Sequence, residues 1–116
     1  MSESVFLGLD IGTSAVKAIL VAPSGDVEAA ATTALTLSTP RPGWAEQDPD
    51  AWWDATTRSI REVLAGKPNA TISSVGISGQ MHSSVFLDRA GAVVRPALLW
   101  CDGRTTDECA EITRRA

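Results

Sequence analysis

The chain contains few of the residues that bind transition metals or carry redox chemistry. Its 116 residues include two cysteines and one histidine. Cys101 and Cys109 are too far apart in sequence for a Cys-x-x-Cys pair, and only His82 accompanies them. This composition indicates neither a zinc site nor a redox site, and we expect both thiols to be reduced.

Clusters of basic residues and long apolar runs are also missing. Ten Lys and Arg against 14 Asp and Glu give a formal net charge of −4, and the cations form no stripe. A nucleic-acid partner held through its phosphates is therefore not expected. No apolar run approaches the length that crosses a bilayer, and the first four residues carry no basic lead-in, so we expect a cytoplasmic protein with no membrane partner.

What the chain does contain is a regular alternation of strand-like and helix-like segments. A hydrophobic share of 44% suits one modest core, hence one domain or part of one. The order predicts an α/β fold with a mixed sheet and flanking helices. Expected are strands at 5–11, 15–21, 27–37 and 72–79, a loop at 38–47, helices at 49–65 and 105–116, a hairpin at 85–94 and an extended piece at 96–100.

The first helix has clear start and stop signals. Asp48 can cap it, Pro49 suits its first position, and Gly66 ends it. Large apolar side chains recur along this helix at offsets of three, four and seven residues, and we expect this apolar stripe to pack on the sheet. Its members are Trp53, Ile60, Val63 and Leu64.

The turn between the first two strands is the first candidate site. Asp10 precedes Gly12-Thr13-Ser14, whose small residues let a ligand approach the backbone amides, so the turn can bind phosphate while Asp10 holds Mg²⁺ through water. An ordinary hairpin turn, in which Asp and Thr bond their own amides, explains the same residues. A dinucleotide fingerprint is disfavoured because its glycine spacing is absent, and a P-loop is excluded because Lys17 lies well past the turn.

The second candidate site follows the strand at 72–79. One face of that strand carries only Ser and Gly, so another group is expected to approach it closely. Gln80-Met81-His82 comes next, where a sheet edge commonly meets ligands. His82 can donate to and accept from hydroxyl groups. A histidine bonded only to the backbone fits the same position, and the residues alone leave this open.

Five segments in matching order resemble the N-terminal part of the FGGY carbohydrate kinases, most closely the xylulokinases. Glycerol kinases differ at the second cluster, with Gln-Arg-Glu in place of Gln80-Met81-His82. The segments are Gly8-Leu9-Asp10-Ile11-Gly12-Thr13-Ser14, Pro42-Gly43-Trp44-Ala45-Glu46-Gln47-Asp48-Pro49, Trp52-Trp53, Gly76-Ile77-Ser78-Gly79-Gln80-Met81-His82 and Leu99-Trp100-Cys101-Asp102-Gly103-Arg104.

The resemblance implies an actin-like (ribonuclease H-like) ATPase fold that transfers the γ-phosphoryl group of ATP, with Mg²⁺, to D-xylulose or a similar ketose. It implies that Asp10 is the catalytic, metal-side carboxylate. The nucleotide side would comprise Gly12, Thr13, Ser14 and Lys17, and the sugar side Gln80, Met81, His82, Asp102 and Arg104.

The resemblance also implies that parts of the enzyme lie elsewhere. Similar kinases take their general base from a Gly-rich segment far downstream and bind adenosine in a second domain. Residues 1–116 are thus expected to be the N-terminal part of the first kinase domain, inactive alone and prone to homodimer formation through an uncovered sheet. Alternatives are a kinase for ribulose, gluconate or glycerol, a non-catalytic sugar-binding module, and an actin-like chaperone or cytoskeletal ATPase.

Overall fold

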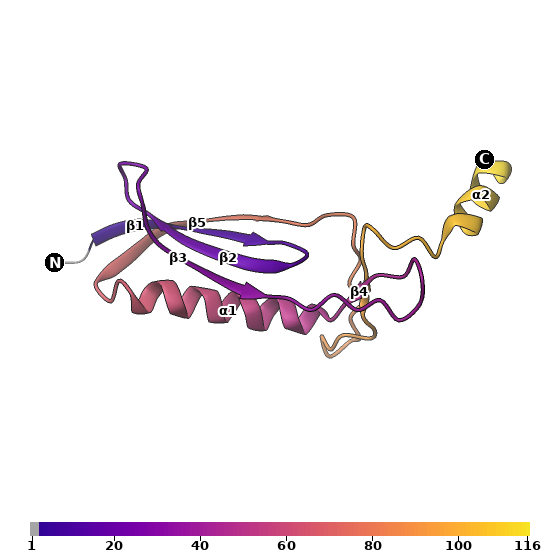
Figure 1. Cartoon of the computed structure of the whole chain (residues 1–116), viewed down its shortest axis with the longest axis horizontal. Coiled ribbons are helices and arrows are strands. Elements are labelled where there is room, and N and C mark those ends of the chain that lie inside the picture. Colours follow the sequence, from indigo (N-terminus) through magenta and orange to yellow (C-terminus); the bar gives the residue numbers. More distant parts are fainter. Residues whose placement is uncertain (1–2) are drawn as a thin grey trace. The chain divides into compact units, whose positions relative to one another are not determined.

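A computed structural model describes residues 3–116, which divide into two compact units (Figure 1). The first unit contains the residues up to Thr36 together with Asp50–Gln80. The second unit contains Leu37–Pro49 and Met81–Ala116. Each unit carries one of the two candidate sites.

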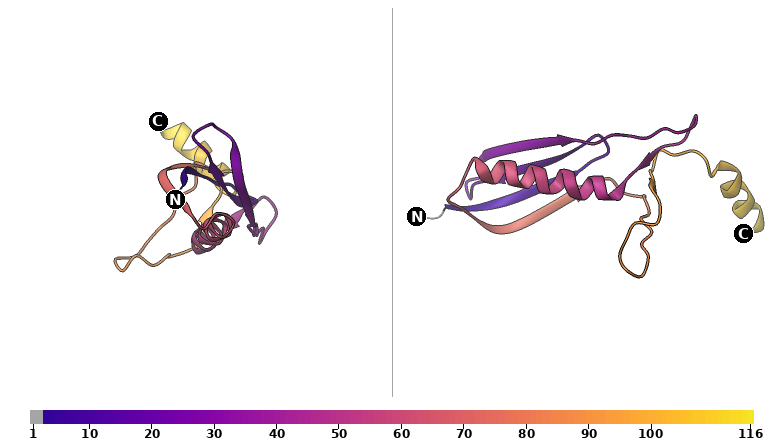
Figure 2. Two further views of the ribbon diagram at one scale, coloured as in Figure 1. Left: turned by 90° about the vertical axis from the view of Figure 1, so that its left-hand side faces the viewer. Right: turned by 90° about the horizontal axis from the view of Figure 1, so that it is seen from below.

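The first unit is a four-stranded mixed sheet with one helix on it. The strand order is β3-β2-β1-β5, with β1 antiparallel to β2 and parallel to β5. α1 runs along one face of this sheet (Figure 2). The predicted α/β fold with a mixed sheet is confirmed. The elements are β1 (Glu3–Ile11), β2 (Ala15–Val21), β3 (Val27–Ala34), α1 (Pro49–Ala65) and β5 (Ala70–Gly79).

Alternation along β1 separates the core face from an open face. Val5, Leu7 and Leu9 are buried and cluster with Leu20 and Val63, because successive strand residues point to opposite faces. The intervening Phe6, Gly8 and Asp10 pair in register with Ser74, Gly76 and Ser78 of β5. The Ser and Gly face expected on β5 therefore lies away from α1, and a Cβ added at Gly76 would meet no atom within 4 Å. Among residues 3–116, no atom makes the expected close approach at Gly76.

The prediction for the buried stripe of α1 is wrong at Trp53. Ile60, Val63 and Leu64 do pack on the core, but Trp53 is 70% exposed. The centre of the buried face is occupied by small residues that a search for large apolar side chains overlooks, namely Ala55, Thr56 and Ser59. Ser59 Oγ donates to the carbonyl oxygen of Val16 at 3.2 Å, so the helix approaches β2 closely and Trp53 lies on the flank of the contact.

The second unit contains a two-stranded sheet and a helix. β4 (Glu46–Gln47) pairs antiparallel with β6 (Ala97–Leu98), and α2 (Thr106–Arg115) follows. The predicted loop at 38–47 therefore ends in a short strand, and the extended piece at 96–100 contains one. β3 stops at Ala34, three residues before the expected end.

The predicted hairpin at 85–94 forms its turn without forming strands. The Asp88 carboxylate accepts hydrogen bonds from the amides of Ala90 at 2.8 Å and Ala92 at 2.9 Å. Pairing of the two arms is limited to a bridge between Leu87 and Val93, where the Val94 amide donates to the Phe86 carbonyl at 2.9 Å. Two short strands without a third strand or a helix on them gain little burial, and the turn chemistry alone did not extend the pairing.

Gly79 provides a test of the contact between the ends of β1 and β5. A Cβ at this position would lie 2.8 Å from the carbonyl oxygen of Ile11, a backbone atom that cannot rotate away. We expect Gly79→Ala to lower the free energy of unfolding by about 1 to 3 kcal/mol. Urea denaturation followed by circular dichroism measures it.

Gly76→Ala is the matched control on the same strand, since its Cβ would meet open space. This variant should leave stability unchanged or raise it by up to about 1 kcal/mol. Equal losses in the two variants would contradict the contact described for Gly79.

Candidate functional site

The turn between β1 and β2 is closed by backbone hydrogen bonds. The Gly12 amide donates to the Ala15 carbonyl at 3.0 Å, and the Leu35 amide donates to the Ser14 carbonyl at 2.8 Å. A Cβ on Gly12 would lie 3.1 Å from the Ala15 oxygen, which favours glycine there. Asp10 is exposed at the end of β1, so its carboxylate is accessible beside the turn.

Gln80 is fastened to this turn, although the sequence placed it with the sugar-binding residues. Its amide donates to the Ile11 carbonyl at 2.9 Å, extending the pairing of β1 and β5 by one bond. Its side chain accepts from Thr13 Oγ1 at 3.2 Å and donates to the Gly12 carbonyl at 3.4 Å. Gln80 thus fixes the conformation of the predicted phosphate turn.

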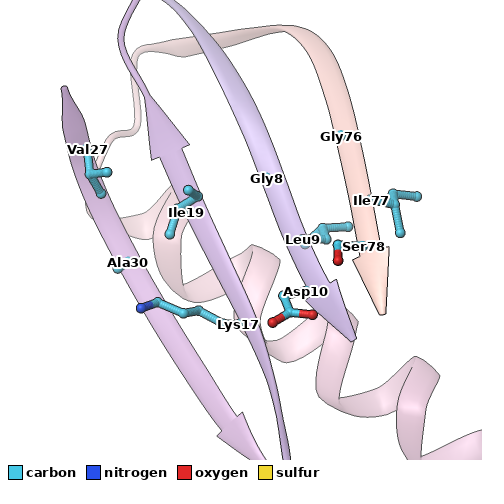
Figure 3. A pocket seen from close by; sticks show the side chains of 10 residues that line it. All are labelled: Gly8, Leu9, Asp10, Lys17, Ile19, Val27, Ala30, Gly76, Ile77 and Ser78. Carbon is cyan, nitrogen blue, oxygen red and sulfur yellow. The ribbon is translucent and has the colours of Figure 1, made fainter. Parts of the chain in front are cut away.

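Asp10 and Lys17 lie on neighbouring strands at one end of a hollow on the open face of the sheet. They are register partners of β1 and β2, and Figure 3 shows the Lys17 ammonium group pointing away from the Asp10 carboxylate. The hollow measures about 560 Å³ and is otherwise mainly apolar. Its lining is Gly8, Leu9, Asp10, Lys17, Ile19, Val27, Ala30, Gly76, Ile77 and Ser78.

His82 lies at a pocket of about 370 Å³ within the second unit. The backbone of His82 has φ +63°, a left-handed conformation that is uncommon for residues other than glycine. Strain of this kind persists where the surroundings enforce it and is concentrated at ligand sites. The lining is His82, Ser84, Phe86, Arg95, Pro96, Leu98, Leu99, Trp100, Asp102 and Thr105.

Asp102 and Arg104 form a partly buried ion pair beside this pocket. Their side chains are 4% and 13% exposed, and Arg104 Nη2 lies 2.8 Å from Asp102 Oδ2. The carboxylate also accepts hydrogen bonds from Arg104 Nε and from the amides of Ala45 and Arg104. These donors hold the pKa of Asp102 well below its usual value of 3.8, the Arg104 side chain most strongly.

Arg104 joins Asp102 to the segment before α1. Its Nη2 donates to Glu46 Oε1 at 2.8 Å, and its guanidinium carbon lies 3.6 Å from the ring centroid of Trp44. Both carboxylates raise the pKa of Arg104. Trp44 belongs to the Pro-Gly-Trp segment, which carried the family resemblance but had no role assigned from the sequence. In the fold, the Trp44 ring packs against the Arg104 guanidinium group.

The structure therefore distributes the predicted residues over the two units. The first unit brings together Asp10, Gly12, Thr13, Lys17 and Gln80 around one turn. In the second unit His82 and Asp102 line the same pocket, Arg104 reaches it through Asp102, and Met81 is 67% exposed.

Sequence reasoning missed several residues of the pocket. Ser84, Phe86, Arg95 and Thr105 line it, and Glu46 supports it through Arg104. The four lining residues carry no local motif, and their only signal was proximity in sequence to the motifs at 80–82 and 99–104. Glu46 lies in the segment Pro42–Pro49 that carried the family resemblance, which gave it no role.

Residues 5–116 match the N-terminal domain of the FGGY family of carbohydrate kinases. The chain belongs to this family. The match covers both candidate sites and every element of the fold except the first two residues of β1.

Named relatives include kinases for different polyols. Xylulose kinase of Escherichia coli (strain K12) is 44% identical over 111 residues, which are 96% of this chain and 23% of that protein. Glycerol kinase of Aquifex aeolicus (strain VF5) is 35% identical over 111 residues, 95% of this chain and 23% of that protein. The chain thus spans less than a quarter of the length of these curated relatives.

A solved structure shares the fold. The crystal structure of xylulose kinase from Rhodospirillum rubrum superposes with a TM-score of 0.92 and 40% identity, covering 97% of this chain and 23% of that one. The fold described above is therefore that of the N-terminal portion of an FGGY kinase.

Within residues 3–116, no helix is long and apolar enough to cross a membrane. In the same residues, no three His, Cys, Asp or Glu side chains gather closely enough to hold a metal ion.

The ion pair of Asp102 gives the second unit a characteristic response to acid. Because the folded-state pKa is lowered, the carboxylate stabilises the fold fully above its usual value of 3.8 and progressively less as the pH falls below it. Asp102→Asn should be less stable than the parent chain at pH 7. We expect the difference to shrink below about pH 4, measured as urea midpoints from pH 7 to pH 2.5.

Asp54→Asn is the control, because Asp54 lies on the exposed side of α1. The urea midpoint of Asp54→Asn should differ little from that of the parent chain at every pH. A stability gap for Asp102→Asn that stays constant down to pH 2.5 would contradict the ionic role of Asp102.

Proposed function

We propose that the polypeptide carrying these residues phosphorylates D-xylulose, using ATP and Mg²⁺, in the cytoplasm. The observation that carries the proposal is the turn at Gly12-Thr13-Ser14, held by Gln80, in a chain that belongs to a carbohydrate kinase family. The 44% identity to a named xylulose kinase supports the choice of sugar.

On the nucleotide side, we assign Asp10 to the metal. Its exposed carboxylate is the oxygen ligand that Mg²⁺ prefers, and Mg²⁺ normally keeps several waters and binds phosphates alongside one or two carboxylates. Bound Mg²⁺·ATP would supply the transferable phosphoryl group, and the metal ion would offset the negative charge of the phosphates. Asp10 would hold the metal ion, and the backbone amides of the turn at 12–14 would orient the phosphates.

On the sugar side, we assign hydroxyl binding to His82. The imidazole can donate to one hydroxyl and accept from another, and it lies at a pocket that also offers Ser84 and Thr105. Trp100 supplies an apolar wall. We further propose that Met81 contacts the sugar, since it precedes His82 and its side chain is largely exposed.

The remaining parts of the enzyme are proposed to lie outside these residues. The described sites contain no carboxylate in the role of general base for the sugar hydroxyl, since Asp102 is fully occupied by donors. We propose that the base and the adenosine pocket belong to the part of the relatives that this chain does not span, and that the segment alone is inactive. A homodimer stays a prediction.

A second candidate is phosphorylation of glycerol, ribulose or gluconate. The 35% sequence identity to a glycerol kinase supports this second candidate. Sugar choice depends on individual hydroxyl contacts, which can be rearranged by a few side chains.

A coupled ADP-release assay separates these candidates. The product of the complete reading frame that contains these residues is tested with xylulose, ribulose, glycerol and gluconate side by side. We expect the highest kcat/KM with xylulose and full dependence on Mg²⁺. Turnover of glycerol above xylulose would favour the second candidate, and turnover of none of the four would contradict both.

Variants at the two sites should affect different kinetic constants. Asp10→Ala is expected to lower kcat by about 100-fold or more, because it removes the carboxylate proposed to hold the metal ion that stabilises the charge of the transferred phosphoryl group. His82→Asn is expected to raise KM for the sugar about tenfold and leave KM for ATP unchanged. Asparagine is chosen because it tolerates the left-handed backbone of His82.

Arg114→Ala serves as the control, since Arg114 is an exposed residue of α2 that pairs with Glu111. Wild-type constants in both site variants would show that the assignments are wrong. An effect of His82→Asn on ATP rather than sugar would reverse the roles of the two sites.

A further inference from the structure

The segment at 96–105 forms most of one wall of the His82 pocket. It supplies six of the ten lining residues. This wall is held by a short segment far away in the sequence: Leu99 donates to the Ala45 carbonyl at 3.0 Å, and Gly103 donates to the Gly43 carbonyl at 2.8 Å. The wall thus depends on how tightly residues 43–47 are attached to it.

Arg104 provides a side-chain attachment between these two segments. Its guanidinium group bonds Asp102 on its own side and Glu46 on the other, and stacks on Trp44. We call these four residues the Arg104 cluster. Two carboxylates around one guanidinium group, in a site where Arg104 is 13% exposed, make charge-assisted bonds whose geometry a flexible ammonium group cannot reproduce.

Asp102 lines the pocket but has little capacity to bind a sugar hydroxyl. Four N–H groups surround it, from Ala45 N and from Arg104 N, Nε and Nη2. An ionised carboxylate offers about four acceptor positions. Its bonding therefore serves to orient the wall, and Arg104 is not among the lining residues at all.

We propose that Arg104 is a positioning residue for sugar binding, which fixes the 96–105 wall of the His82 pocket by joining Asp102 to Glu46 and Trp44. The inference rests on the proposed function, because it assigns this pocket to the sugar. It differs from direct substrate binding by Arg104 in that the effect travels through Asp102, which lines the pocket.

The test uses Arg104→Lys and Arg104→Gln in the complete enzyme. Lysine keeps the charge and loses the forked geometry, and glutamine loses both. We expect KM for xylulose to rise about tenfold in Arg104→Lys and further in Arg104→Gln. KM for ATP and kcat per folded enzyme should stay within about twofold, with folded fractions taken from thermal melts.

Arg114→Lys is the matched control, an exposed arginine that also pairs with a glutamate. Its KM for xylulose, KM for ATP and kcat should equal those of the wild type. Equal changes in KM for xylulose and ATP, or lower melting temperatures with unchanged KM values, would overturn the positioning role while leaving the proposed function standing. A wild-type enzyme that phosphorylates none of the sugars would overturn the proposed function, and the inference with it.

Discussion

The parallel pairing of β1 with β5 is the constraint on which the first unit depends. It brings the ends of both strands to one edge of the sheet, where Ile11 pairs with Gly79 and accepts the Gln80 amide. Without this pairing Gln80 could not bond Thr13 and Gly12. The same alignment leaves Asp10 exposed beside the turn, so the geometry of one strand pair creates the candidate nucleotide site.

Side-chain ion pairs help to hold the second unit together, whereas the first unit is held together by strand pairing. Its two strands have two residues each, too few to be stable alone. The Arg104 cluster adds bonds between segments about 58 positions apart in the sequence. Since removing one partner of such a pair leaves the other charge buried and unpaired, the cluster is sensitive to substitution. The segment Pro42–Pro49, which helped to identify the family, therefore has a structural role at the pocket wall through Trp44 and Glu46.

Much of this arrangement was predictable from local signals. The β1–β2 turn, the start of α1 at Pro49 and the mixed sheet follow from turn residues, capping residues and alternation. The position of Trp53 was not predictable, because small residues rather than large ones mark the centre of the helix contact. The Glu46–Arg104 pair was also hidden, since no periodicity links residues so far apart. Membership of the FGGY family was predicted from the motifs and is confirmed.

The central claim is that the turn beside Asp10 takes the phosphates of ATP while the pocket at His82 takes the sugar. The most direct measurement is a crystal structure of the complete enzyme with xylulose and a non-hydrolysable ATP analogue. The account predicts a sugar hydroxyl within about 3 Å of the His82 imidazole and the metal-bound γ-phosphate next to Asp10. Sugar bound away from His82, or phosphates away from the turn at 12–14, would contradict it.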